Sequence, residues 1–324
     1  MRLDNALPYL ALWMCSLAIS PGMAQAPSSQ PAVIARAPHR FPSWQNDPSV
    51  RYTITAEEER TTNHPPAEAH RLSLRLLVDV TLTPYEMRAD GSGWMRGTLE
   101  RIELDGRSGA RRFRYDSKQD KPGQANATAD LLAVIVGREF RIRLGPSGRF
   151  EEFTGFNAAW RSQGLLAAPA AVASIQSLFR DHAMLNLLRD ALSPPLGRDL
   201  GMPGASWQSV MPGEIPGLTL LECVATFTIE PQNPAAPGGS IRVQGQGDVR
   251  TIRPDADIPT AGLLAEATSG QQSWALRLAP ETHQVISNET HRNVVLKVRL
   301  VPPAPSDSPA MTIRQTLRII ASRQ

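Results

Sequence analysis

Hydrophobic and polar residues alternate strictly along residues 71–83 (RLSLRLLVDVTLT). A period of two sends successive side chains to opposite faces, so this segment is predicted to be a strand with one core face and one wet face. The same alternation returns in residues 291–301. The apolar positions are Leu72, Leu74, Leu76, Val78, Val80 and Leu82 in the first segment, and Val294, Leu296, Val298 and Leu300 in the second.

Shorter alternating segments are separated by glycine, proline and aspartate, which is typical of an antiparallel meander of hairpins. We place turns at residues 90–93 (DGSG), at Asp105-Gly106 and at residues 145–148 (GPSG). The further strands are expected at residues 52–56, 94–104, 110–115, 140–144, 149–153, 218–229, 241–252, 273–278 and 311–320.

One segment in the middle of the chain, residues 170–192, has helical spacing, and Pro194-Pro195 ends it. It could be a lid or a partner helix, or a helix packed on the open face of the sheet. Surface helices usually bury their apolar stripe in their own domain, which favours the second interpretation. Its stripe consists of Ile175, Leu178, Leu185, Leu188 and Leu192.

These patterns predict a mainly β fold. We expect long antiparallel meander sheets, curved or half-barrel in shape, with one central amphipathic helical segment. An N-terminal β half would cover residues 49–200, including the helix at 170–192, and a C-terminal β half residues 201–324. Similar strand–turn–strand cues at residues 141–153 and 276–287 leave an internal duplication open.

The first 26 residues have the order of a secretory signal peptide. Arg2 is followed by an uncharged segment at residues 10–19, a helix-breaking Pro21-Gly22 and the cleavage pattern Ala24-Gln25-Ala26. A short buried N-terminal helix is the alternative, but it would not need that ending. We therefore expect cleavage after Ala26, a disordered Pro- and Ser-rich lead at residues 27–48, and a periplasmic or secreted protein that does not span the membrane.

The amino-acid composition limits which classes of partner the protein is expected to bind. Only three of the 34 basic residues are lysines, and the arginines alternate with acidic residues, so no basic stripe for nucleic acid is evident. Arg107, Arg111, Arg112 and Arg114 form the densest group and are expected on an exposed hairpin. Cys223 stands alone after signal removal, and its apolar neighbours predict a small buried hydrophobe.

We find no motif that commits the chain to a reaction, a metal or a cofactor. His64 and His70 match no common ligand spacing. Glu151 and Glu152 are adjacent on an expected strand and would point to opposite faces, so they cannot act together across a sugar bond. Two glycines within an expected strand, Gly245 and Gly247, indicate a bulge or a close contact.

Three segments together resemble a catalogued family of exported bacterial β-rich proteins of unknown function. They are residues 112–118 (RFRYDSK), residues 136–150 (VGREFRIRLGPSGRF) with Gly155 after them, and residues 204–207 (GASW). The resemblance covers most of the mature chain. It implies a bacterial envelope or secreted protein, and it implies no catalytic residue.

Three functions remain open. The first is non-enzymatic binding of an apolar or lipid-like ligand in the curved sheet, with Leu178, Leu185 and Leu188 facing the cavity. The second is a protein-interaction module of the cell envelope, without a cavity, that binds an envelope partner. The third is an exported hydrolase. A cavity lined by leucine and valine would favour the first, an exposed apolar patch the second, and a cleft of converging carboxylates or a Ser–His pair the third.

Overall fold

The computed structural model describes residues 43–44, 49–65, 68–123, 126–165, 170–196, 200, 202–215, 219–231, 239–252, 263–300 and 310–324. The expected signal peptide and most of the expected lead lie outside these residues. The strands are β1 (Val50–Asn63), β2 (His70–Tyr85), β3 (Gly93–Ser108), β4 (Arg111–Asp116), β5 (Glu139–Leu144), β6 (Phe150–Thr154), β7 (Ser206–Ile215), β8 (Thr219–Ile229), β9 (Ile241–Thr251), β10 (Leu263–Leu278), β11 (Val285–Leu300) and β12 (Met311–Arg323). The α-helices are α2 (Ala127–Ala133), α3 (Phe156–Ser162), α4 (Ala170–Leu178) and α5 (Asp181–Leu192).

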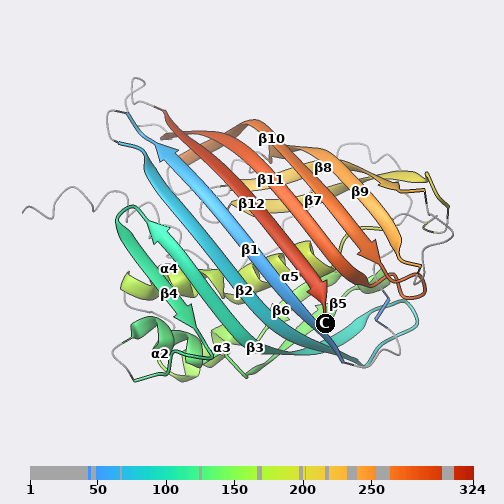
Figure 1. Cartoon of the computed structure of the whole chain (residues 1–324), viewed down its shortest axis with the longest axis horizontal. Coiled ribbons are helices and arrows are strands. Elements are labelled where there is room, and N and C mark those ends of the chain that lie inside the picture. Colours follow the sequence, from blue (N-terminus) through green and yellow to red (C-terminus); the bar gives the residue numbers. More distant parts are fainter. Residues whose placement is uncertain are drawn as a thin grey trace, which may run out of the picture.

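In the described part of the chain the strands form one open antiparallel sheet of twelve strands (Figure 1). Its order is β6-β5-β3-β2-β1-β12-β11-β10-β9-β8-β7, with β4 paired to β3. The chain runs from the centre outward to β6, crosses through the helices to β7, and returns inward to pair β12 with β1. The prediction of a mainly β fold with long antiparallel strands is therefore confirmed.

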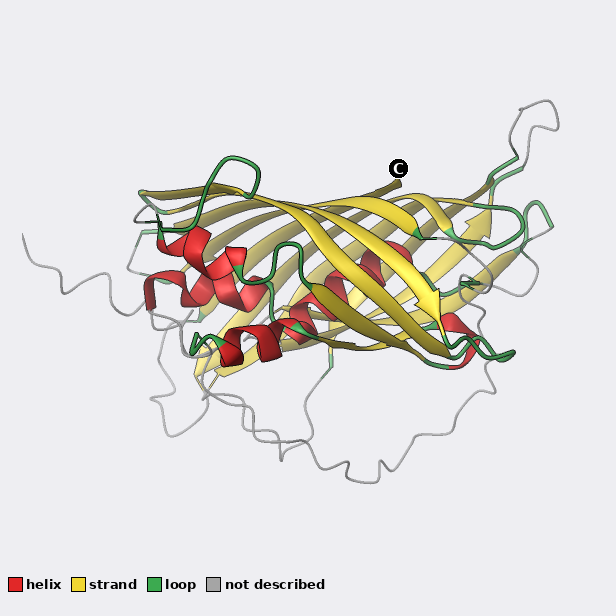
Figure 2. Ribbon diagram, turned by 90° about the horizontal axis from the view of Figure 1, so that it is seen from below, coloured by secondary structure: helices red, strands yellow, loops and turns green. Residues whose placement is uncertain are grey.

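The helices lie within the curve of the sheet, on its concave face (Figure 2). Buried apolar side chains form two groups there. Cluster 1 joins β1–β6 to the four helices and includes Ile319 and Ala321 of β12. Cluster 2 lies under β7–β12 and includes Cys223, which is buried as expected, and burial raises the pKa of its thiol to about 12. Among the described helices, none combines the length and apolar character needed to cross a bilayer.

The expected helix at residues 170–192 is wrong as a single helix, because it is divided into α4 and α5. The break places the Phe179 side chain, which is fully buried, in cluster 1. It also frees Asp181, whose carboxylate accepts the backbone N–H groups of Phe156 and Asn157 at 2.9 and 3.1 Å and so caps α3. The apolar spacing alone did not reveal this break, since both parts keep the same period.

The expected turn at Asp105-Gly106 is also wrong, because β3 continues to Ser108 and the chain turns at Gly109. Gly106 is needed inside the strand, since a Cβ there would lie 2.2 Å from the ring of Phe113, its directly paired partner. Gly97 is covered in the same way by Phe140 across β3 and β5. An aromatic ring folded over a cross-strand glycine shields backbone that would otherwise be exposed.

Of the bulge or close contact predicted at Gly245 and Gly247, the structure shows close contacts, because a Cβ would lie 2.5 Å from the ring of Phe227 at the first and 2.5 Å from the backbone oxygen of Val224 at the second. Gly245 is paired with Phe227 on one side and with Trp274 on the other, and the two rings approach to 5.1 Å above it. Trp207 stacks on Phe227 at 5.5 Å, which extends the row to the edge strand β7. The exposed arginine group also lies where expected, on the β3–β4 hairpin.

Candidate functional site

The two edge strands of the sheet, β6 and β7, are not paired with each other, and α5 contacts both. Arg189 donates from Nε to the backbone oxygen of Phe150 on β6 at 3.2 Å. His182 places Nε2 3.0 Å from a carboxylate oxygen of Glu214 on β7, and Asn186 donates to the same oxygen at 3.3 Å. A helix therefore closes the concave side where a closed sheet would use strand pairing.

The C-terminal end of α5 is attached to the centre of the sheet. Asn288 of β11 is almost fully buried and donates from Nδ2 to the backbone oxygens of Asp190 and Ala191, at 2.9 and 3.0 Å. The last carbonyls of a helix lack partners within it, so this side chain satisfies two of them. The two hydrogen bonds from Asn288 hold the C-terminal end of α5 against β11.

The three leucines expected to line a cavity are brought together by the apolar face of the helical segment. Leu188 is fully buried, Leu185 is buried, and Leu178 is half-buried, and all three pack in or against cluster 1. In this structure they are packing residues between the helices and the sheet. That they face a ligand stays a prediction.

Between the two apolar clusters, polar side chains point from four adjacent strands to the concave face. We call this set the polar belt: Glu58 and Arg60 on β1, Gln315 on β12, Arg292 on β11 and Gln272 on β10. On β12 the belt residue separates Ile319 of cluster 1 from Ile313 of cluster 2. The belt thus divides the apolar interior and runs beside the C-terminal end of α5.

One side of the belt is internally satisfied. Arg60 donates from Nε and Nη2 to one carboxylate oxygen of Glu58, at 3.0 and 2.6 Å. Gln315 donates to the same oxygen at 2.7 Å, while its own buried Oε1 has no partner among the described residues. The charge of Glu58 is therefore compensated within the belt.

The charge of Arg292 is not compensated in this way. Its side chain is 5% exposed, and within the described part of the chain it forms no ion pair. Its Nη2 donates a long hydrogen bond, 3.4 Å, to the backbone oxygen of Glu214, and its buried Nε has no partner there. A buried cation without a close counter-ion is costly, and Arg292 is such a charge among the described residues of the concave face.

Three titratable groups on α5 have raised pKa values and are shifted toward their protonated forms, and the first of them is Asp181, whose pKa is raised by burial. The hydrogen bond to Glu214 is the main reason that the pKa of His182 is raised. Burial of the Asp190 carboxylate raises its pKa to about 6, although Arg292 and Arg189 act in the opposite direction. The helix that closes the concave side therefore carries an aspartate with a pKa of about 6 and a histidine whose pKa lies above its ordinary value.

Asp190→Asn tests this shift. A folded-state pKa of about 6, above the ordinary 3.8, contributes stability below pH 4 that is lost as the pH rises through 6. The full shift is worth about 3 kcal/mol, and solvent screening reduces it to about 2 kcal/mol. We expect the free energy of unfolding of the wild type, relative to that of the variant, to fall by about 2 kcal/mol between pH 4 and pH 7 in urea titrations. A difference that does not change with pH would contradict the assignment.

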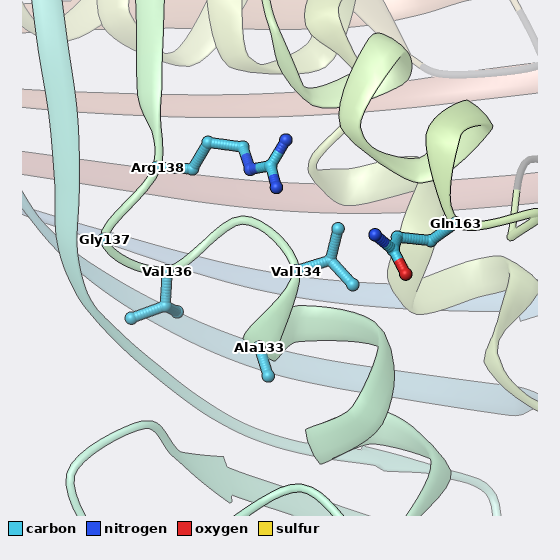
Figure 3. A pocket seen from close by; sticks show the side chains of 6 residues that line it. All are labelled: Ala133, Val134, Val136, Gly137, Arg138 and Gln163. Carbon is cyan, nitrogen blue, oxygen red and sulfur yellow. The ribbon is translucent and has the colours of Figure 1, made fainter.

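Two surface hollows are smaller than the roughly 300–1,000 Å³ of ordinary ligand pockets. The first, about 220 Å³, lies between the ends of α2 and α3, where Val134, Arg138 and Gln163 surround it (Figure 3). The second, about 250 Å³, lies on the outer face under β4 and mixes Arg101 and Arg114 with Glu103 and Asp116. Neither is lined by the three predicted leucines.

Sequence reasoning missed the polar belt, although a signal for it was present. Arg292 is in phase with Val294 and Leu296, and Gln315 is in phase with Ile313 and Leu317. A polar residue on the apolar phase of a strand indicates either a buried polar contact or a site. Assembling five such residues into one belt required the strand order.

No protein-family model and no curated protein matches the chain. Among solved structures, a lipovitellin structure on lipid–protein interactions is similar over 85% of this chain and 25% of that one, at 11% identity and a TM-score of 0.43. The structure of DynF from the dynemicin pathway of Micromonospora chersina is similar over 93% of this chain and 92% of that one, at 10% identity and a TM-score of 0.20. The structure of an outer-membrane channel from Pseudomonas putida F1 is similar over 87% of this chain and 98% of that one, at 10% identity and a TM-score of 0.22. The chain spans a quarter of the lipovitellin chain, and similarity at these scores carries no inference about ligands.

The fold and the site together define a class: an open antiparallel sheet whose concave face is closed by helices and divided by a buried polar belt.

Proposed function

We propose that this protein binds an apolar, lipid-like ligand on the concave face of the sheet, beneath α4 and α5. The observation that carries the proposal is the closure of the apolar interior by a helix instead of by strand pairing. Lifting α5 breaks its contacts to Phe150, Glu214 and Asn288 but leaves every strand ladder intact.

The energies of closure and binding are comparable. The four large buried apolar side chains of α5 are worth roughly 8 kcal/mol together, at about 2 kcal/mol each. A twelve-carbon acyl chain that is buried in their place returns a similar amount, at about 0.8 kcal/mol for each methylene group. A ligand of this size can therefore replace the helix on the sheet. The residues concerned on α5 are Met184, Leu185, Leu188, Ala191 and Leu192.

We further propose that the protein is exported and acts without catalysis in the periplasm or outside the cell. The order of charged, apolar and small residues up to Ala26 supports export. The three segments of the family resemblance lie on β4, on the β5–β6 hairpin and at the start of β7. They support membership of the family of exported β-rich proteins.

Native mass spectrometry of the exported protein, residues 27–324, purified without detergent, tests the proposal. We expect an adduct with the mass of a fatty acid or lipid that disappears after extraction with organic solvent. A protein that shows only its sequence mass and also takes up no added acyl ligand would overturn it.

A second candidate is an interaction module, and four large apolar side chains that are exposed in the described part of the chain favour it. Leu220 lies on β8, and its backbone oxygen accepts the N–H of Ile252, which directly follows β9. Leu264 is the second residue of β10. Met202 is the fourth. In the same mass spectra, a clean oligomer or a co-purified protein without a lipid adduct would favour this function.

A further inference from the structure

We propose that Arg292 is the anchor for an anionic head group, a carboxylate or a phosphate, of the ligand. This inference rests on the proposed function and names the chemical class of its ligand: an acyl chain that ends in a negatively charged oxygen group.

The first support is the poor satisfaction of Arg292 itself. Its guanidinium has five N–H donors in a fork that matches carboxylate or phosphate oxygens. In the structure it is 5% exposed, donates one long hydrogen bond at 3.4 Å, and has a buried Nε without a partner among the described residues. Such a group becomes satisfied when an anion arrives.

The second support is the contrast with Arg60 in the same belt. Arg60 holds Glu58 with two hydrogen bonds, and Gln315 adds a third to the same oxygen. Glu58 is thereby occupied, and no described carboxylate forms an ion pair with Arg292. The belt therefore keeps one arginine paired and leaves the other available.

The third support is the absence of a side chain at Gly213 of β7, directly beside the guanidinium of Arg292. A Cβ at that position would lie 3.1 Å from Nη1, which is tighter than ordinary van der Waals contact, so any side chain there would crowd the guanidinium. Gln272 is directly paired with Arg292, and Gln315 lies diagonally across from it on β12; both are buried. The directly neighbouring sheet positions are thus small or neutral and polar, while the carboxylates of Glu58 and of Asp190 on α5 act on Arg292 from beyond ion-pair distance.

The position of Arg292 also suits an acyl chain. Leu317, its direct partner on β12, packs against cluster 1, and Asn288, four residues earlier on β11, holds the end of α5. A head group at Arg292 places the chain toward cluster 1, beneath the face of α5 that carries Leu185 and Leu188.

The test is isothermal titration of the delipidated exported protein with three ligands of equal chain length: dodecanoate, dodecyl phosphate and dodecanol. Arg292→Met removes the charge and keeps the volume, and Arg292→Lys keeps the charge. Arg318→Met is the matched control, because Arg318 is on the neighbouring strand but pairs with Glu289 and Glu57 on the outer face.

We expect Arg292→Met to weaken binding of at least one anionic ligand by about 10- to 100-fold and to leave dodecanol unchanged. Arg292→Lys should keep a preference for the anion over dodecanol, and Arg318→Met should match the wild type. The stronger of the two anions identifies the head group as carboxylate or phosphate.

If Arg292→Met binds all three ligands like the wild type, the anchor is overturned while the proposed function stands. If the wild type binds none of them, the proposed function fails, and the anchor fails with it. If Arg292→Met does not fold, the Gly213→Ala variant tests the anchor in its place. The added Cβ crowds Nη1 of Arg292, so this variant should bind the anionic ligands more weakly and dodecanol as tightly as the wild type does. If its affinities for the anions and for dodecanol change by the same factor, the anchor is overturned.

Discussion

Gly245→Val is expected to lower the free energy of unfolding by about 3 kcal/mol or more. A Cβ at this position would lie 2.5 Å from the ring of Phe227 and 3.1 Å from the ring of Trp274. Both rings are fully or almost fully buried in cluster 2 and cannot move away into solvent. Overpacking of a dense core costs about 1–3 kcal/mol and sometimes more, and valine adds further branches to the first clash.

Equilibrium unfolding in urea, followed by tryptophan fluorescence, measures this effect, because Trp274 and Trp207 belong to the affected row. Gly239→Val is the matched control, since nothing lies within 4 Å of a Cβ there, and we expect a change below about 0.5 kcal/mol. Equal stability of the two variants would show that the aromatic rings do not close over Gly245.

Leu188→Ala is expected to lower the free energy of unfolding by about 3 kcal/mol and to raise ligand affinity by about tenfold. Leu188 is fully buried between α5 and the sheet, so its truncation removes packing and leaves a cavity. The same loss makes α5 easier to lift. An apparent affinity is limited by the population of the binding-competent state, and a weaker closed state raises that population. The lost contact with the ligand removes part of the gain.

Urea unfolding and titration with dodecanoate measure the two effects on one variant. Leu178→Ala is the control, because Leu178 is half-buried on α4 and should cost about 1 kcal/mol. If Leu188→Ala loses stability but binds dodecanoate with unchanged affinity, ligand binding does not require α5 to leave the sheet.

The neighbourhood of α5 separates what periodicity can reveal from what it cannot. Alternation in residues 71–83 and 291–301 predicted β2 and β11 because one face of each strand is buried and the other is wet. The helical stripe predicted that residues 170–192 pack on the sheet. The break at Phe179 escaped prediction, since it serves a contact with α3, which is distant in the sequence.

Two glycines also show that local sequence does not reveal which residues lie across from a position on neighbouring strands. Gly106 follows an aspartate and has the local signature of a turn. Its real environment is set by Phe113 on the neighbouring strand, whose ring occupies the space of a side chain. Gly245 was recognised as a strand glycine because alternation continues on both sides of it, but its two aromatic neighbours come from β8 and β10.

The sequence by itself determined the β class, the inward and outward faces of the long strands, and the burial of the helical stripe, because each depends on the local order of apolar and polar residues. Only the tertiary structure decided that β1 pairs with β12, that α5 lies between the unpaired edges, and that Arg292 is buried without an ion pair in the described chain. These features join residues far apart in the chain. Their energies depend on which side chains meet, and local periodicity carries no information about that.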